Sequence, residues 1–171
     1  MKKLMLLFAL VCCMGSAGFA QRFCVIDSKY ILDKLPEYEQ AQKQIDDQST
    51  IWQGIVDSAM QKVDQMYKSY QAERPMLSEA ARKSREDEIV AKEKAAKELQ
   101  KKYFGYQGLV FQKRETLIKP IQDKVFNAVQ QYAKSRAYDI IYDKAGGITI
   151  FYADPKLDKS EDIVKLIQQS K

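Results

Sequence analysis

The feature that most constrains the fold is a helical repeat of apolar residues that runs unbroken from residue 36 to about residue 74. Side chains recur at spacings of three and four, which places them on one stripe of an α-helix. Pro36 suits the first helical position, and Glu37 and Glu39 follow at the positive end of the helix dipole. At 1.5 Å per residue, this segment predicts a rod of about 58 Å. The stripe comprises Tyr38, Ala41, Ile45, Gln48, Trp52, Ile55, Ala59, Val63, Met66 and Tyr70.

A second helical pattern follows Pro75, which ends the first helix, and Ser78 and Glu79 favour a new helix start. Two long helices joined by a few residues form an antiparallel hairpin. Their stripes are expected to face each other, because no other element is predicted alongside them. Pro120 predicts a kink or a break late in the returning helix. The returning stripe is expected at Leu77, Ala81, Ser84, Glu88, Ala91, Ala95, Leu99, Tyr103, Tyr106, Val110, Leu117 and Ile121.

The C-terminal part is apolar and predicts strands. Residues 138–143 and 147–153 are expected to form a hairpin, joined by "KAGG", whose two glycines allow the positive φ of a tight turn. Residues 22–28 predict a third strand, and Ser160 is the expected N-cap of a last helix. Three strands that are apolar on both faces would leave one face exposed in a single chain. We therefore predict self-association of this sheet, with the interface candidates Phe23, Val25, Ile140, Ile141, Tyr142, Ile148, Ile150 and Phe151.

The N-terminal segment has the pattern of a secretory signal. Lys2 and Lys3 precede an apolar run, and small residues follow it, so cleavage is predicted before Gln21. The alternative is an uncleaved membrane anchor, for which the apolar run is short. Removal of residues 1–20 would lower the formal net charge from +5 to +3 and leave Cys24 without a disulfide partner. The mature chain is expected to be soluble outside the cytoplasm.

The composition argues against the common enzyme classes. The chain contains no histidine, which removes the commonest general base and the commonest metal ligand. It also lacks the glycine-rich motifs that bind nucleotide phosphates. The sequence therefore predicts a protein that is not an enzyme and needs no cofactor or metal. A modest basic surface between residues 104 and 144 favours lipopolysaccharide or an anionic lipid surface over nucleic acid, although a solvated helix face also explains it.

In the order and spacing of these elements, the whole mature chain resembles the Skp, or OmpH, family of periplasmic chaperones. The resemblance is carried by "FCVIDSKYILDKLPEYEQAQKQI", the charged arms, "LIKPIQDKVFNAVQQYAKSRAYDIIYDKAGGITIFYA" and the closing "EDIVKLI". It implies a homotrimer in which a β-rich body carries helical-hairpin arms around a cavity. It also implies an ATP-independent holdase in the periplasm that binds unfolded outer-membrane proteins and prevents their aggregation.

The expected fold class is therefore α+β and mostly α. A long antiparallel helical hairpin, residues 36–119, would project from a small antiparallel β-sheet body, residues 21–35 and 120–171, which trimerises. A structural or adaptor coiled-coil protein of the cell envelope is the alternative function, since mixed-sign arms suit it equally well. Basic residues of the arm are candidates for steering an acidic client toward the cavity: Lys92, Lys97, Lys101, Lys102, Lys113 and Arg114.

Overall fold

The computed structural model describes residues 21–169, so the predicted signal peptide, residues 1–20, lies outside the described part. The described chain divides into two compact units. Unit 1 comprises residues 21–31 and 127–169, and unit 2 comprises residues 32–126. The divisions fall within helices α2 (Ser28–Asp33) and α6 (Lys119–Arg136).

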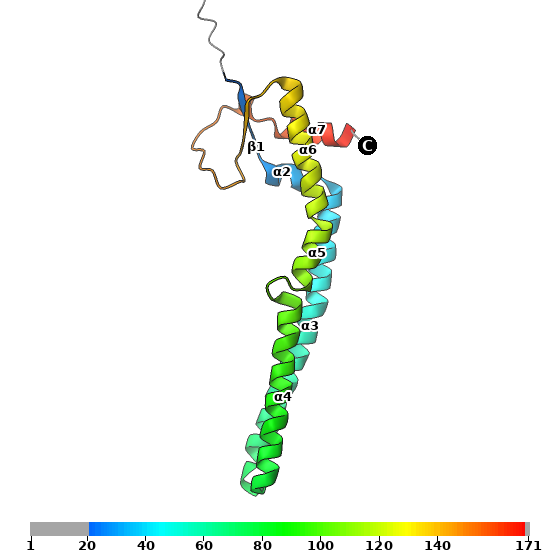
Figure 1. The fold of residues 1–171 in the computed structure, drawn as a ribbon, viewed down its shortest axis with the longest axis vertical. Coiled ribbons are helices and arrows are strands. Elements are labelled where there is room, and N and C mark those ends of the chain that lie inside the picture. Colours follow the sequence, from blue (N-terminus) through cyan, green and yellow to red (C-terminus); the bar gives the residue numbers. More distant parts are fainter. Residues whose placement is uncertain (1–20, 170–171) are drawn as a thin grey trace, which may run out of the picture. The chain divides into compact units, whose positions relative to one another are not determined.

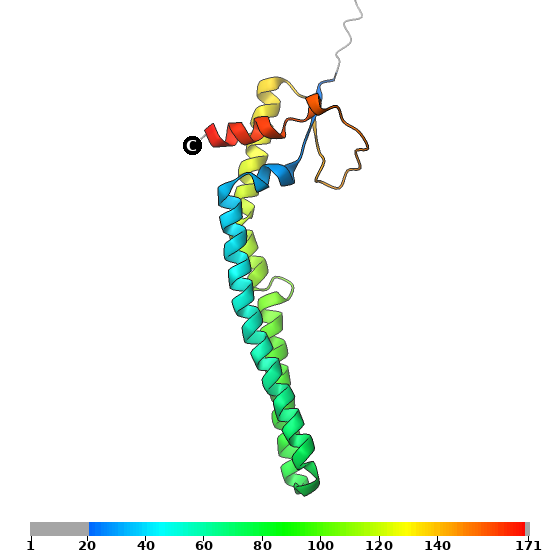
Figure 2. The same cartoon turned by 180° about the vertical axis from the view of Figure 1, so that it is seen from behind.

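Unit 2 is built around the predicted long helical hairpin. Helix α3 (Pro36–Glu73) carries Pro36 in its first turn, together with the acidic residues Glu37 and Glu39. A short 3-10 turn, η1 (Arg74–Met76), reverses the chain, and α4 (Glu79–Phe104) returns beside α3 in both views (Figures 1 and 2). The cap of α4 is the predicted Ser78, whose hydroxyl accepts a hydrogen bond from the Ala81 N–H at 3.3 Å.

The buried side of α3 differs from the predicted stripe at one position. Val56 is buried, whereas Ile55, which was expected on the stripe, is exposed. The buried or half-buried residues Val56, Val63 and Tyr70 are spaced by seven, the repeat of a coiled-coil seam. Ile55 lies one residue off this repeat, so its side chain turns away from the seam.

The predicted stripe of α4 is wrong over much of its length. Ala91 and Ala95 are exposed, whereas Ile89, Ala96 and Tyr103 are buried at a spacing of seven. This heptad brings the large side chain of Ile89 into the seam. Tyr103 then meets α3, where its ring stacks on Trp52 with centroids 5.3 Å apart. The two polar residues of the predicted stripe, Ser84 and Glu88, are also exposed.

The returning helix is interrupted twice. Helix α5 (Leu109–Leu117) is separated from α4 by a loop, Gly105–Gly108, which the helical pattern did not predict. The second break lies at Ile118, directly before α6, and Pro120 occupies the first turn of that helix. Pro120 has no backbone N–H to donate, so it is tolerated in the first turn of a helix but not in the interior. The predicted break therefore lies just before it.

The sheet of unit 1 is parallel, which corrects the predicted antiparallel hairpin. Strand β1 (Phe23–Ile26) pairs in parallel with β2 (Ile140–Asp143), with Phe23 opposite Ile140. Residues 147–153 form no strand. A tight type I′ hairpin needs positive φ at two adjacent residues, but within residues 144–147 only Gly147 has it, at 82°. Strand β2 instead pairs with the distant β1, as the long helical connection allows.

The core of unit 1 combines buried residues of β1 with those of the last helix. Cys24 and Ile26 of β1 are buried, and the strongly amphipathic α7 (Ser160–Gln169) contributes Ile163, Val164 and Ile167. A short turn, η2 (Pro155–Leu157), leads into α7. The chain is held against β1 just before this helix, where the Lys159 N–H donates to the Val25 carbonyl at 2.9 Å.

Candidate functional site

The outer face of the sheet is the first candidate surface. Phe23, Ile140 and Tyr142 are all exposed there, while the neighbouring Cys24 and Ile26 of β1 are buried. The rings of Phe23 and Tyr142 meet edge to face, with centroids 6.3 Å apart. Apolar side chains that line up on one face of a two-stranded sheet need a cover to be stable in water.

An apolar loop segment lies beyond the end of β2. Ile148 and Tyr152 are exposed, and Phe151 is 97% exposed. This segment and the neighbouring Lys144 and Asp158 line a shallow groove. Exposed apolar side chains that gather on one surface are typical of sites that contact another chain. Together, the outer sheet face and residues 148–152 form what we call the apolar surface of unit 1.

Most of the residues predicted for the interface lie on this surface. Ile141 and Ile150 are half-buried, and Val25 is 4% exposed. Val25 lies on the same face of β1 as Phe23, opposite Tyr142, but its side chain is buried, so it belongs to the core of unit 1. The predicted interface residues that the structure leaves exposed are Phe23, Ile140, Tyr142, Ile148 and Phe151.

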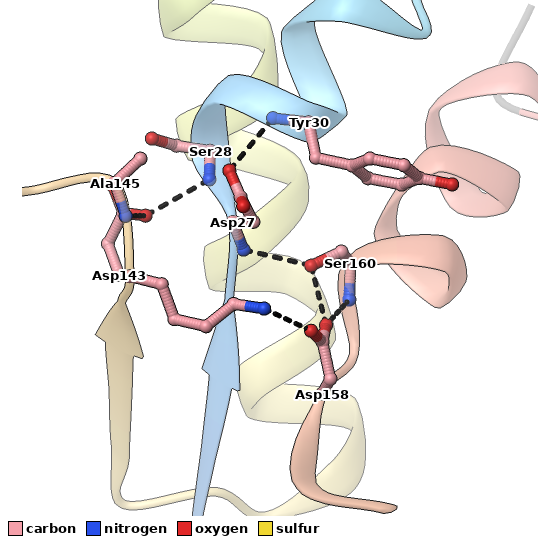
Figure 3. A network of polar contacts seen from close by, with 8 residues as sticks. Asp27, Ser28, Tyr30, Asp143, Ala145, Asp158 and Ser160 are labelled. Carbon is pink, nitrogen blue, oxygen red and sulfur yellow. Dashed lines mark hydrogen bonds and ion pairs between the residues drawn. The ribbon is translucent and has the colours of Figure 1, made fainter. Parts of the chain in front are cut away.

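A network of polar contacts holds the segment between β2 and α7 in place (Figure 3). Asp158 lies at its centre, where its carboxylate accepts hydrogen bonds from the Lys144 ammonium at 2.5 Å and from the Ser160 hydroxyl at 2.6 Å. The Ser160 hydroxyl in turn accepts from the Asp27 N–H at 2.8 Å, and Asp143 accepts from the Ser28 N–H at 3.0 Å. The predicted helix cap, Ser160, is thus the first residue of α7, and its side chain fixes the chain after β1 instead.

Two tyrosines attach α7 to the rest of unit 1. The Tyr132 hydroxyl donates to Asp162 at 2.8 Å, and the Tyr30 hydroxyl donates to Glu161. Burial and the hydrogen bond to Asp162 raise the pKa of Tyr132 well above its usual range, so it stays protonated as a donor. This network was missed by sequence reasoning, because its members are far apart in the chain and none belongs to a motif.

Asp158 makes the stability of unit 1 depend on pH. Burial tends to raise the pKa of Asp158, but hydrogen bonds from Lys144 and Ser160 outweigh it and hold the pKa below its ordinary value. A carboxyl with a lowered folded-state pKa stabilises the protein above its unfolded pKa, and that contribution is lost as the pH falls through the folded value. Asp158→Asn is therefore expected to cost about 1 kcal/mol or less at pH 7, since the pair is partly solvated.

Urea unfolding at several pH values tests this expectation. The difference between the Asp158→Asn variant and the natural protein should shrink as the pH falls from about 5 toward 3 and below, where the natural carboxylate also becomes protonated. Asp87→Asn, on an exposed position of α4, serves as the control. A difference that stays constant over this pH range would contradict the assigned role of the carboxylate.

The predicted steering residues lie on two helices of unit 2. Lys92, Lys97, Lys101 and Lys102 belong to α4, whereas Lys113 and Arg114 belong to α5. Lys97 and Lys101 share one face because they are four residues apart. Lys97 pairs with Glu93 at 2.5 Å, and Lys102 lies 5.6 Å from the centre of the Tyr103 ring. Among residues 21–169, the other four form no ion pair.

Unit 2 also exposes apolar side chains away from its seam. Near the η1 turn, Tyr67 and Val90 flank a shallow groove floored by the buried Tyr70 and Ile89. The Tyr70 hydroxyl donates to Glu86 across this groove, which connects the two helices. Scattered apolar and charged side chains on a long helix pair offer many weak contacts rather than one enclosed pocket.

Neither a metal-binding group nor a membrane-spanning helix is found among the described residues. Within residues 21–169, no group of three or more histidine, cysteine or acidic side chains could hold a metal ion. No helix in the same range has the length and apolar character needed to cross a bilayer. The candidate functional features are the apolar surface of unit 1 and the exposed faces of the helices of unit 2.

Comparison with known proteins assigns the chain to a family. Residues 22–167 match the family model described as "Outer membrane protein (OmpH-like)". The chain belongs to the OmpH-like family. The resemblance inferred from the order of the sequence elements is thus confirmed.

A solved structure has a similar fold to this OmpH-like chain. It is a protein from Caulobacter crescentus CB15, described as an outer membrane chaperone (OmpH-like), with a TM-score of 0.66 and 12% sequence identity. The similarity covers 88% of this chain and 86% of that chain. At this level of identity, the likeness shows the fold alone. No curated protein matches the chain.

Proposed function

We propose that this OmpH-like protein is an ATP-independent holdase chaperone of the periplasm. It binds unfolded outer-membrane proteins in a cavity between the arms of a homotrimer and prevents their aggregation. The observation that carries the proposal is the pairing, in one chain, of an uncovered apolar sheet face with long solvent-exposed helices. Family membership supports it, because a relative of the same fold is described as an outer membrane chaperone.

The apolar surface of unit 1 is the proposed assembly surface. In a trimer, copies of Phe23, Ile140 and Tyr142 cover one another, which removes their exposed apolar area from water. The loop residues 148–152 add the exposed side chains of Ile148, Phe151 and Tyr152 to the surface that a neighbouring copy can cover.

The helices of unit 2 are the proposed client-binding elements. An unfolded β-barrel protein presents scattered apolar side chains, and exposed residues such as Ile51, Tyr67 and Val90 offer it many weak contacts. The basic residues of α4 and α5 raise the local concentration of an acidic client by long-range attraction. Lys97 can take part although it pairs with Glu93, because an exposed ion pair contributes at most about 1 kcal/mol.

An aggregation assay separates this proposal from its alternative, a structural or adaptor protein of the envelope. An outer-membrane β-barrel protein is diluted from urea, and light scattering is followed with increasing amounts of the purified protein. The holdase is expected to suppress scattering, with saturation near three chains per client and no dependence on ATP. An adaptor would leave the scattering unchanged even at a large excess, and that result would overturn the proposal.

A further inference from the structure

The loop between α4 and α5, Gly105–Gly108, is built in one specific conformation. The Gly105 N–H donates to the Lys101 carbonyl at 2.9 Å, and the Gly108 N–H donates to the Gly105 carbonyl at 2.8 Å. A Cβ atom on Gly105 would lie 2.4 Å from the Lys101 carbonyl oxygen, and one on Gly108 would lie 2.8 Å from the Tyr103 carbonyl oxygen. Both contacts are with backbone atoms, so neither glycine can carry a side chain without movement of the loop.

Between these glycines, the loop presents one aromatic side chain to solvent. Tyr106 is 96% exposed, although the flanking Gly108 is buried. The next residue, Gln107, has a φ of 57°, in the left-handed region that non-glycine residues rarely occupy. Its carbonyl accepts a hydrogen bond from the Gln112 side chain at 3.0 Å, which ties the loop to α5.

Packing of the helical pair does not require this loop. Tyr103 is buried, and Val110 and Leu117 are half-buried, at intervals of seven residues. An uninterrupted helix would place the same three side chains on one face, because seven residues make about two turns. The loop lacks the hydrogen bonds of a continuous helix and holds one residue in an unfavourable backbone conformation. What the loop provides, and a continuous helix would not, is the exposed side chain of Tyr106.

The surroundings of Tyr106 are aromatic and basic. Phe104 and Phe111, on either side of the loop, are exposed. Residues 99–114 contain four basic and no acidic side chains. The facing helix α3 adds no acidic side chain between residues 48 and 56, around the Trp52 that stacks on Tyr103. A surface with this charge is complementary to an acidic partner, and exposed rings bind other rings by stacking or edge contacts.

We propose that the α4–α5 loop is a docking point for an extended, acidic segment of polypeptide. An aromatic side chain of the segment contacts Tyr106, and its carboxylates pair with the basic residues beside the loop, which are Lys101, Lys102, Lys113 and Arg114. The source of the segment follows from the proposed function, so this assignment depends on that function. Unfolded β-barrel proteins supply such segments, since aromatic residues gather at both ends of their strands.

Fluorescence anisotropy with a labelled synthetic peptide tests the docking point in the purified protein. The probe is a short unstructured peptide that contains aspartates and tryptophans, and two matched probes replace either the tryptophans by alanine or the aspartates by asparagine. Tyr106→Ala is expected to weaken binding of the first probe by roughly three- to tenfold, while Tyr106→Phe keeps the ring and most of the affinity. The tryptophan-free probe should bind the natural protein and Tyr106→Ala equally.

A matched control and a separate assay keep the outcomes distinct. Phe126→Ala removes another exposed aromatic side chain of unit 2 and should leave peptide affinity unchanged. Unchanged affinity in Tyr106→Ala, or no measurable binding of the first probe by the natural protein, overturns the docking point. If the natural protein suppresses client aggregation while Tyr106→Ala binds peptide normally, only this site fails. If the peptide effect holds while aggregation is not suppressed, only the holdase function fails.

Discussion

Replacing Phe23 with aspartate is expected to convert the assembled protein into single chains. Phe23 is 47% exposed on the outer face of the sheet, where it contacts Tyr142. In the proposed trimer this position is buried against neighbouring copies, and burial of an unpaired carboxylate costs several kcal/mol at each of the three symmetry-related positions. In a single chain the same carboxylate faces water, so the fold of unit 1 should tolerate it.

Size exclusion with light scattering measures this effect directly. The natural protein is expected to elute with the mass of three chains and to keep it on dilution, whereas Phe23→Asp should elute with the mass of one. Met76→Asp, at the exposed η1 turn of unit 2, is the matched control and should remain assembled. Equal masses for Phe23→Asp and the natural protein would remove the outer sheet face from the interface. A single-chain mass for the natural protein would contradict the assembly itself.

The long helices could be predicted from the sequence because their signals are local. Pro36, the acidic residues that follow it, and the cap at Ser78 act within a few residues, and they lie where expected. Local signals do not show which of Ile55 and Val56 is buried. Both are apolar and adjacent, so only the heptad shared with the partner helix decides which one is buried.

The sheet could not be predicted because strand pairing is decided over long distances in the chain. The glycines at 146 and 147 suggested a local hairpin, yet β2 pairs with β1, whose residues are more than a hundred positions away. Strand propensity shows which segments can extend but not which partner they choose. Residues 148–152 are apolar, which suggested a strand, but they lie on the surface in a loop.

The candidate site, too, could be predicted only where the signal is local. Five of the eight predicted interface residues are exposed, because apolar residues on a small sheet exceed what one chain can cover. The prediction that Tyr106 lies on the stripe of the returning helix is wrong, because Tyr106 is exposed in a loop. The loop was missed because glycines inside a helical pattern are often tolerated without a break. The signal that could have found it is the pair Gly105 and Gly108, spaced within one turn and surrounded by aromatic residues.

Ile163→Ala is expected to give the largest loss of stability within unit 1. Ile163 is fully buried in the apolar face of α7. Truncation of a large aliphatic side chain in a packed core leaves a cavity and lowers the free energy of unfolding by about 2–5 kcal/mol. Lys165→Ala, on the exposed side of the same helix, is the control and should change it by less than about 0.5 kcal/mol.

Each unit carries its own reporter for this experiment. Cys24 is the one cysteine in residues 21–171 and is fully buried in unit 1, and burial raises the pKa of its thiol. Its reaction with a thiol reagent therefore requires opening of unit 1, since a buried protonated thiol is unreactive. Trp52, the single tryptophan of the chain, lies in unit 2 and reports on that unit by fluorescence.

In Ile163→Ala, the rate of Cys24 labelling is expected to rise roughly thirtyfold or more, because each 1.4 kcal/mol changes the open population tenfold. The urea midpoint reported by Trp52 should move much less, as expected if helices α3 and α4 keep their own seam. An unchanged labelling rate would mean that Ile163 does not support the core around Cys24. Equal shifts of both reporters would mean that the two units unfold as one, and the stability of the arm would then depend on the same core that presents the assembly surface.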